Sequence, residues 1–180
     1  MTPLDIRTAQ RRDAAVLARA EARTARRPGL LVQRPGEIPA CAFAAKISAL
    51  GKVGRYIVAE ERGRPVGHAF LEPMGLAANR HVFRLNIVVH PGRTGRGIGS
   101  ALLADLLAWA SAGSRVGKIE LLVRAGNAPA IALYRKFGFK REGRLVGRVR
   151  LADGTMIDDV AMAWFAEAGR RSRAAQRRDA

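Results

Sequence analysis

Apolar and polar residues follow two different spacings along this chain. Where every second residue is apolar a strand is predicted, and where apolar residues recur every three or four positions a helix is predicted. Strands are expected over residues 4–7, 56–59, 66–71, 81–89, 119–123, 140–151 and 155–165, and helices over 13–27, 39–49, 97–112 and 127–137. This order of elements predicts a mixed sheet with helices packed against it.

Proline and glycine set the expected boundaries of these elements. Pro28-Gly29 ends the first helix, Pro39 opens the second, and Gly51 stops it. Turn residues at 61–65 and at Asp153-Gly154 each separate two strand patterns. Each of these turns therefore predicts a hairpin.

The length and composition of the chain indicate a globular protein. With 180 residues, 48% of them hydrophobic and 26% charged, it is long enough for a full core. We expect one domain over residues 1–165 and a basic, flexible tail over 166–180. No apolar run approaches the ~20 residues that span a bilayer, so no membrane association is expected.

The N-terminal segment and the cysteine content indicate a cytoplasmic protein. Arg11-Arg12 is not followed by the apolar core of an export signal, and Cys41 is the single cysteine. An internal disulfide is therefore impossible, and a reducing compartment is expected. One cysteine and three histidines far apart give no metal-ligand spacing, so no metal is expected.

The chain is strongly basic, with a formal net charge of +17. Such a charge attracts nucleic acid, anionic membranes or phosphorylated ligands. It also arises from an arginine-rich solvated surface, and residues 169–180 alone hold five arginines. We favour the second interpretation over nucleic-acid binding, because aromatic residues are only 6% of the chain and no reading motif is present.

A glycine-rich turn between a strand and a helix is the first candidate for chemistry. Glycines stand at 95, 97 and 99, directly before a leucine-rich helix. Backbone N–H groups and the positive end of the helix dipole make such a turn a site for phosphate groups. Arg93 and Arg96 add cations. The spacing matches neither the dinucleotide fingerprint nor the phosphate loop that ends in Gly-Lys-Ser/Thr, and glycines in a turn also occur without a ligand.

A second candidate begins at Asn127. Asn127 and Tyr134 are seven residues apart, so they lie near one face of the predicted helix, about two turns apart. Taken alone, Asn127 is a good N-terminal helix cap and Tyr134 is a packing residue.

Together the two motifs resemble the GNAT superfamily of acyl-CoA-dependent N-acyltransferases, most specifically over residues 84–139. Gly97 and Gly99 match the glycines of the R/Q-x-x-G-x-G/A loop, with Thr94 in place of Arg or Gln. The N-x-x-A-x-x-L-Y-x-x-x-G-F helix matches throughout, from Asn127 to Phe139. The resemblance implies an α/β (α+β) fold: a mixed, mostly antiparallel seven-stranded sheet, flanked by about four helices and splayed between its fourth and fifth strands.

The resemblance also implies acetyl-CoA as the cosubstrate and assigns roles to residues. Backbone groups of the fourth strand should bind pantetheine and polarise the thioester carbonyl, the loop should hold the diphosphate, and Tyr134 should protonate the departing thiolate as general acid. The implied acetyl-CoA contacts are Ile87, Val88, Val89, Arg93, Thr94, Gly95, Arg96, Gly97, Ile98, Gly99, Ser100, Asn127 and Tyr134.

Two glutamates are candidates for the base that removes a proton from the acceptor amine. Ribosomal-protein N-terminal acetyltransferases, which this region resembles, carry a glutamate on the fifth strand where Leu122 stands here. Glu120 on the same strand face and Glu72 at the end of the third strand are the candidates. Pairing with the abundant arginines is the alternative for each, and a water chain or a neutral acceptor would serve instead.

Asp158 and Asp159 are candidates for binding the substrate, because they interrupt an otherwise apolar strand. The C-terminal hairpin resembles that of GNAT enzymes acting on small amines and amino-acid-like compounds, in which a carboxylate could hold an ammonium group. The alternative is pairing with Arg148 or Arg150 across the hairpin.

The predicted function is therefore acetyl transfer from acetyl-CoA to a primary amine, with a small amine or amino-acid-like compound favoured as acceptor. A protein N-terminus or lysine is the alternative acceptor. A basic nucleic-acid-binding protein and an acyl-CoA sensor without turnover are the rivals from other classes. Family members are often dimers, so a homodimer is also expected.

Overall fold

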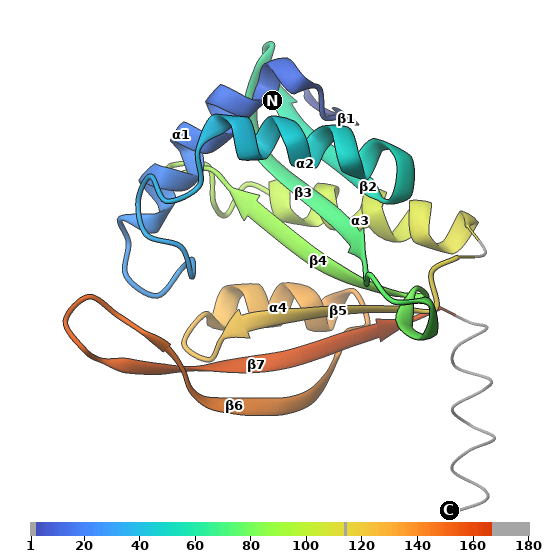
Figure 1. The fold of residues 1–180 in the computed structure, drawn as a ribbon. Helices are drawn as coiled ribbons and strands as arrows, with labels where there is room; N and C mark the ends of the chain where they lie inside the picture. Colours follow the sequence, from blue (N-terminus) through green and yellow to red (C-terminus); the bar gives the residue numbers. More distant parts are fainter. Residues whose placement is uncertain (1–2, 114, 167–180) are drawn as a thin grey trace, which may run out of the picture.

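The computed structural model describes residues 3–113 and 115–166, and these form one seven-stranded sheet in the order β1-β2-β3-β4-β5-β7-β6 (Figure 1). The strands are β1 (Leu4–Thr8), β2 (Arg55–Glu61), β3 (Arg64–Pro73), β4 (Val82–Val89), β5 (Lys118–Arg124), β6 (Lys140–Arg150) and β7 (Met156–Phe165). The helices are α1 (Ala14–Ala25), α2 (Ala40–Val53), α3 (Ile98–Ala112) and α4 (Ala128–Lys136), with short 3-10 turns at Arg11–Asp13 and Ala77–Asn79. The predicted order of elements and fold class are confirmed. Most of the expected tail, residues 167–180, lies outside the described residues.

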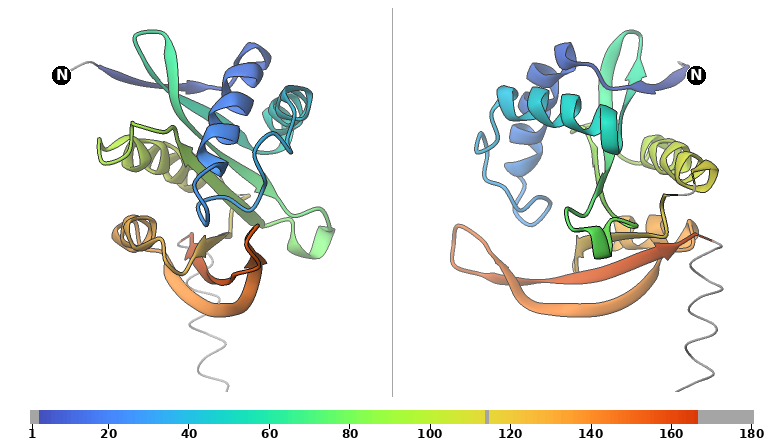
Figure 2. Two further views of the ribbon diagram at one scale, coloured as in Figure 1. Left: turned by 90° about the vertical axis from the view of Figure 1, so that its left-hand side faces the viewer. Right: turned by 45° about the vertical axis from the view of Figure 1, so that its right-hand side comes forward.

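The sheet separates two helical layers. In Figure 2, α1 and α2 lie on one face, and α3 and α4 lie on the other. Alternate residues of β3 serve the two layers: Ala69 and Leu71 pack in the core with α3, whereas Phe70 packs with α1 and α2. His68 lies on the α1–α2 side, fully buried, with its Nδ1 3.0 Å from the hydroxyl of Tyr56.

The parallel pair β4 and β5 is joined only at one end. Three register pairs link the strands, from Val82 with Lys118 to Arg84 with Glu120. Beyond them β4 continues to pair with β3 alone, and β5 continues with β7 alone. The strands diverge toward their C-terminal ends, as Figure 1 shows. The backbone of β4 from Leu85 to Val89 therefore has one edge without a strand partner in the sheet.

The predicted end of α2 is wrong. The helix runs through Gly51 and ends at Gly54, whose N–H donates to the carbonyl of Leu50 at 2.9 Å. A Cβ on Gly51 would meet nothing, whereas a Cβ on Gly54 would lie 2.2 Å from the carbonyl oxygen of Leu71. The close approach of β3 therefore requires glycine at position 54, and a neighbouring strand rather than the local sequence sets this boundary.

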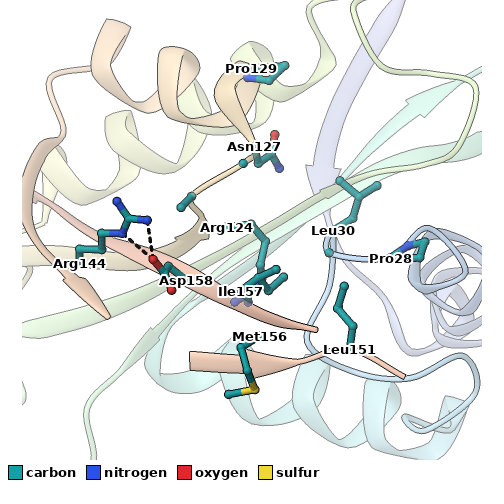
Figure 3. Close-up of a pocket in the computed structure, with 13 residues that line it drawn as sticks. Pro28, Leu30, Arg124, Asn127, Pro129, Arg144, Leu151, Met156, Ile157 and Asp158 are labelled. Carbon is teal, nitrogen blue, oxygen red and sulfur yellow. Dashed lines mark hydrogen bonds and ion pairs between the residues drawn. The ribbon is translucent and has the colours of Figure 1, made fainter. Parts of the chain in front are cut away.

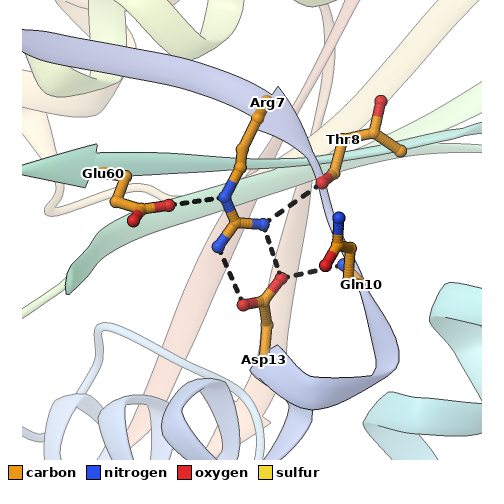
Figure 4. Close-up of polar contacts among 5 residues, drawn as sticks. All are labelled: Arg7, Thr8, Gln10, Asp13 and Glu60. Atoms are coloured by element: carbon orange, nitrogen blue, oxygen red, sulfur yellow. Dashed lines mark hydrogen bonds and ion pairs between the residues drawn. The ribbon is translucent and has the colours of Figure 1, made fainter. Parts of the chain in front are cut away.

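A partly buried ion pair links β1 to the 3-10 turn before α1. Nη1 of Arg7 donates to Asp13 at 2.8 Å and Nη2 at 2.9 Å, while its Nε contacts Glu60 on β2 (Figure 4). Burial opposes the charged carboxylate, but hydrogen bonds from Arg7 and from the N–H of Gln10 keep the pKa of Asp13 below its usual value. These bonds fix the position of α1 beside the sheet.

Candidate active site

The glycine loop, residues 92–97, connects the end of β4 to α3. Gly92, Gly95 and Gly97 have φ angles of 78°, 77° and 79°, a conformation that strains any other residue. A Cβ on any of the three would meet nothing within 4 Å. Backbone conformation, and not crowding, therefore requires glycine here, and the loop leaves space beside its backbone.

The first turn of α3 presents free backbone donors next to this space. The N–H of Ala101 bonds the carbonyl of Gly97 at 3.0 Å and is the first to bond within the helix. The N–H groups of Ile98, Gly99 and Ser100 precede it and have no acceptor within the helix. Together with the helix dipole, these donors suit a diphosphate.

Three segments of the predicted acetyl-CoA site meet at Gly99. A Cβ built there would lie 3.2 Å from Cδ2 of Leu133 on α4 and 3.7 Å from Cγ2 of Val89 on β4. The start of α3, the end of β4 and the middle of α4 are thus in contact range. Ile87, Val88 and Val89 lie on the edge of β4 that has no strand partner.

The two loop arginines share a partner that the sequence did not reveal. Arg93 and Arg96 lie 2.8 Å and 2.9 Å from the two carboxylate oxygens of Glu61, at the end of β2. Glu61 is only 9% exposed, so it holds both guanidinium groups beside the glycine loop. The sequence placed Glu61 only in a predicted hairpin turn over residues 61–65 and did not indicate its pairing with the loop arginines.

The helix α4 carries the second predicted motif as expected. The Oδ1 of Asn127 accepts from the N–H of Ala130 at 3.3 Å, so Asn127 does cap the helix. Tyr134 is 7% exposed and its ring packs 5.6 Å from that of Phe139, centroid to centroid. Burial raises the pKa of the Tyr134 hydroxyl above its usual value, and this hydroxyl has no hydrogen-bond partner among the described residues.

A cleft of about 630 Å³ opens beside the start of α4 (Figure 3). The segment after α1, the end of β5 and the β6–β7 hairpin form its other walls. Its lining residues are Pro28, Gly29, Leu30, Arg124, Ala125, Gly126, Asn127, Pro129, Arg144, Leu151, Met156, Ile157 and Asp158. A Cβ on Gly29 would lie 3.5 Å from Cδ1 of Ile157, so the α1–α2 connection packs directly on β7.

Asp158 and Asp159, which were predicted to bind the substrate, each form an ion pair with an arginine of this cleft. Arg124 contacts Asp159 through Nη1, and both residues are buried, at 7% and 1% exposure. Nη2 of Arg144 lies 2.5 Å from Asp158, whose other oxygen accepts from the N–H of Gly147 at 2.8 Å. These partners differ from Arg148 and Arg150, the pair expected across the hairpin.

Comparison with known proteins agrees with this geometry. The model of the acetyltransferase (GNAT) family matches residues 26–139, which hold the glycine loop, β4, β5 and α4. The chain belongs to the GNAT family. It is accordingly an acyl-CoA-dependent N-acetyltransferase with acetyl-CoA as the acetyl donor.

Individual GNAT relatives differ in their acceptors. L-amino acid N-acetyltransferase AaaT of Escherichia coli (strain K12) is 34% identical over 109 residues, which cover 61% of this chain and 67% of AaaT. N-alpha-acetyltransferase RimI of Mycobacterium tuberculosis is 40% identical over 88 residues, or 49% of this chain and 53% of RimI. The structure of yncA of Salmonella typhimurium, solved with its cofactor acetyl-CoA, has a TM-score of 0.84 at 20% identity, and the match covers 92% of this chain and 95% of the yncA chain.

The two candidate bases of this GNAT enzyme occupy one row of the sheet. Arg84 on β4 pairs in register with Glu72 on β3 and with Glu120 on β5. Each carboxylate has a lysine partner: Lys46 lies 2.9 Å from Glu72, and Lys118 lies 3.3 Å from Glu120. Neither is among the residues that line the cleft.

Leu122, in the place where the resemblance expects a glutamate, is 45% exposed on β5. Its position is open to solvent, yet it offers no group that could accept a proton.

In the described part of the chain, no helix combines the length and the apolar character that a membrane span requires.

Proposed function

We propose that this GNAT enzyme acetylates the α-amino group of a small amino-acid-like acceptor that binds in the cleft beside Asn127. The observation that carries the proposal is that the α1–α2 connection, the end of β5 and the β6–β7 hairpin line one open cleft beside Asn127. Walls on three sides fit a small molecule better than a folded protein surface. The similarity to AaaT, an L-amino acid N-acetyltransferase, supports the same acceptor class.

We place acetyl-CoA across the glycine loop and the open edge of β4. The N–H groups of Ile98, Gly99 and Ser100 would bind its diphosphate, with Arg93 and Arg96 adding charge and Thr94, Gly95 and Gly97 shaping the turn. The backbone of Ile87, Val88 and Val89, together with Asn127, would bind pantetheine. When bound, acetyl-CoA supplies an activated acetyl group as a thioester.

Tyr134 is the proposed general acid. Its raised pKa keeps the hydroxyl protonated at every physiological pH, and the hydroxyl has no other hydrogen-bond partner among the described residues. A protonated phenol can give its proton to the thiolate that leaves when the amine nitrogen bonds the acetyl carbon. The proton lost by the amine must travel elsewhere.

Glu120 and Glu72 are the proposed acceptors of that proton. Glu120 and Glu72 are paired with lysines and do not line the cleft, so either would act through water. The open space around Leu122, on the same strand face as Glu120, supports a water-mediated path for Glu120. An acceptor that arrives as the neutral amine needs no such base.

Acetylation of a protein N-terminus is the second candidate, because RimI matches this chain at 40% identity. Leu122 distinguishes the small acceptor from the protein N-terminus. The ribosomal-protein enzymes that this region resembles carry a glutamate at this place. The lack of a carboxylate there favours the small acceptor.

We further propose a cytoplasmic homodimer. Cys41 is exposed, which suits a reducing compartment. The edge strand β6 leaves Val146 83% exposed and Leu145 39% exposed. Apolar residues on an unpaired strand edge favour association with another strand.

Thiol release from acetyl-CoA, followed with a panel of acceptors, tests the acceptor class. The panel pairs free L-amino acids with peptides that begin with the same residues. We expect turnover of free amino acids to exceed that of the peptides at least tenfold in kcat/KM. Faster turnover of the peptides would instead identify a protein N-terminal acetyltransferase.

A further inference from the structure

Arg124 has a buried guanidinium group, and only one of its three nitrogens has a hydrogen-bond partner among the described residues. Its exposed fraction is 7%, and it lines the cleft from the end of β5. Nη1 donates to Asp159, whereas Nη2 and the fully enclosed Nε have no partner among the described residues. Buried donors without an acceptor are costly and uncommon in folded proteins. A cationic group that lines a cleft with Nη2 unpartnered points to a ligand that supplies the acceptor for Nη2.

The other ionic groups of the cleft are already engaged. One oxygen of Asp158 accepts from Arg144 and the other accepts from the N–H of Gly147. Asp159 lies behind Arg124 and is 1% exposed. Both carboxylates thus have cationic partners, while Arg124 keeps free donors. The group in the cleft that lacks a partner is therefore a cation, which would bind an anionic oxygen and not an ammonium group.

The geometry of the Arg124 guanidinium further limits which ligands can bind. Because Nε is fully enclosed, Nη2 is the donor of Arg124 that a ligand in the cleft can reach, and a charged N–H donor binds a carboxylate oxygen more strongly than a neutral acceptor. Asp159 holds Nη1, so the guanidinium is fixed in place before a ligand arrives. The tight turn that follows brings α4 close, because the N–H of Asn127 donates to the carbonyl of Arg124 at 2.9 Å.

We propose that Arg124 binds the carboxylate of the acceptor, so that the acceptor is a free α-amino acid. This inference rests on the proposed function and adds the group that selects the acceptor. In an α-amino acid the carboxylate and the amine are attached to the same carbon. A carboxylate on Arg124 therefore keeps the amine within a few ångströms of it, beside the start of α4 and the proposed pantetheine site.

The remaining lining residues indicate the side chain of that amino acid. Leu30, Leu151, Met156 and Ile157 form an apolar wall across the cleft from Asn127 (Figure 3). An apolar side chain such as that of methionine or leucine fits this wall, whereas a charged one would lose its hydration there. A peptide N-terminus has a neutral amide in place of the carboxylate, so Arg124 disfavours peptides.

The test compares L-methionine with L-methioninamide, which keeps the side chain and the amine but lacks the carboxylate. In the wild-type enzyme we expect kcat/KM for methionine to exceed that for methioninamide by about 10- to 100-fold, as hydrogen bonds to a charged group imply. This arm requires no variant. Equal values for the two compounds would overturn the inference and leave the acetylation of small amines standing.

The paired variant Arg124→Met with Asp159→Asn removes the guanidinium without leaving a buried carboxylate unpaired. We expect it to lower kcat/KM for methionine about 10- to 100-fold, and to change the value for methioninamide and the Kd of acetyl-CoA less than threefold. Arg148→Met, an exposed change on β6 outside the cleft, is the control and should alter neither substrate. An equal loss for both compounds would show a structural role and refute the inference. Turnover of peptides with none of either compound would refute the proposed function as well.

Discussion

Arg96 of the glycine loop lies 2.9 Å from Glu61, which also binds Arg93 at 2.8 Å. A single carboxylate therefore holds both arginines that are proposed to contact the diphosphate of acetyl-CoA. The two guanidinium groups are restrained before the ligand arrives. Restraint of this kind strengthens binding because less side-chain entropy is lost on association.

Replacing Glu61 should weaken acetyl-CoA binding without changing the chemical step. In Glu61→Ala we expect the Kd of acetyl-CoA to rise about 2- to 10-fold, since ordering one long side chain costs about 0.5–1.5 kcal/mol. Calorimetric titration measures it. Glu60→Ala is the matched control, because Glu60 pairs with Arg7 and not with the loop. Binding to Glu61→Ala that is as tight as in the wild type would contradict the positioning role.

The two tyrosines of the chain allow a matched test of the general acid. In Tyr134→Phe we expect kcat to fall about 100-fold with the Kd of acetyl-CoA nearly unchanged, because only proton donation is lost. Tyr56→Phe breaks the bond to His68 and should lower stability while leaving kcat unchanged. The role fails if Tyr134→Phe retains wild-type kcat at saturating substrates.

The same tyrosine predicts the alkaline limb of the pH profile. Burial raises its pKa above the usual value of about 10, so the acid form persists as the pH rises. We expect kcat to show no decline up to pH 10 from the loss of this proton, in measurements of initial rate at saturating substrates. A decline centred well below pH 10, present in the wild type and absent in Tyr134→Phe, would show that the phenol ionises earlier.

A buried histidine predicts loss of stability in mild acid. Burial lowers the pKa of His90 to about 4, with His68 and Arg23 acting in the same direction against the hydrogen bond that His90 donates to the Pro65 backbone. The unfolded chain, with a histidine pKa near 6.5, takes up the proton first as the pH falls. The free energy of unfolding should therefore drop between about pH 6.5 and pH 4, by about 3 kcal/mol in total from this group.

Urea unfolding at several pH values measures this drop. In His90→Gln we expect a smaller decrease between pH 7 and pH 4.5 than in the wild type. His81→Gln, at an exposed position, should behave like the wild type. An identical decrease in all three proteins would contradict the assignment to His90.

Two glycines near the end of α2 test whether contact with β3 determines where this helix ends. Gly54→Ala should destabilise the protein by about 1–3 kcal/mol, because the new methyl group meets the Leu71 carbonyl. Gly51→Ala should stabilise it by about 0.5–1 kcal/mol, since position 51 is helical and open. Thermal unfolding of both variants checks the opposite signs.

The elements of the fold followed from local pattern, while several contacts of the site did not. Period-two and helical spacing predicted every strand and helix, because a half-buried surface determines that spacing. The end of α2 depended on β3, which approaches from another part of the chain. The two motifs of the GNAT site were readable because each is contiguous in the sequence.

The partners of Asp158 and Asp159 show why the cleft was harder to predict. If the register that pairs Val149 with Ile157 continued, Arg148 would lie opposite Asp158. The register instead shifts between Leu145 and Val149, so Asp158 bonds Arg144 and the N–H of Gly147. Bulges of this kind arise from tertiary packing and leave little trace in the local sequence.

A titration of the isotope-labelled protein with CoA, followed by backbone amide resonances, tests the placement of the donor most directly. We expect the amide signals of residues 95–100 to shift strongly with CoA and only weakly with pantetheine, which lacks the diphosphate. Signals of residues 87–89 should shift with both ligands. Binding of CoA that leaves residues 95–100 unchanged would contradict the proposed role of the glycine loop.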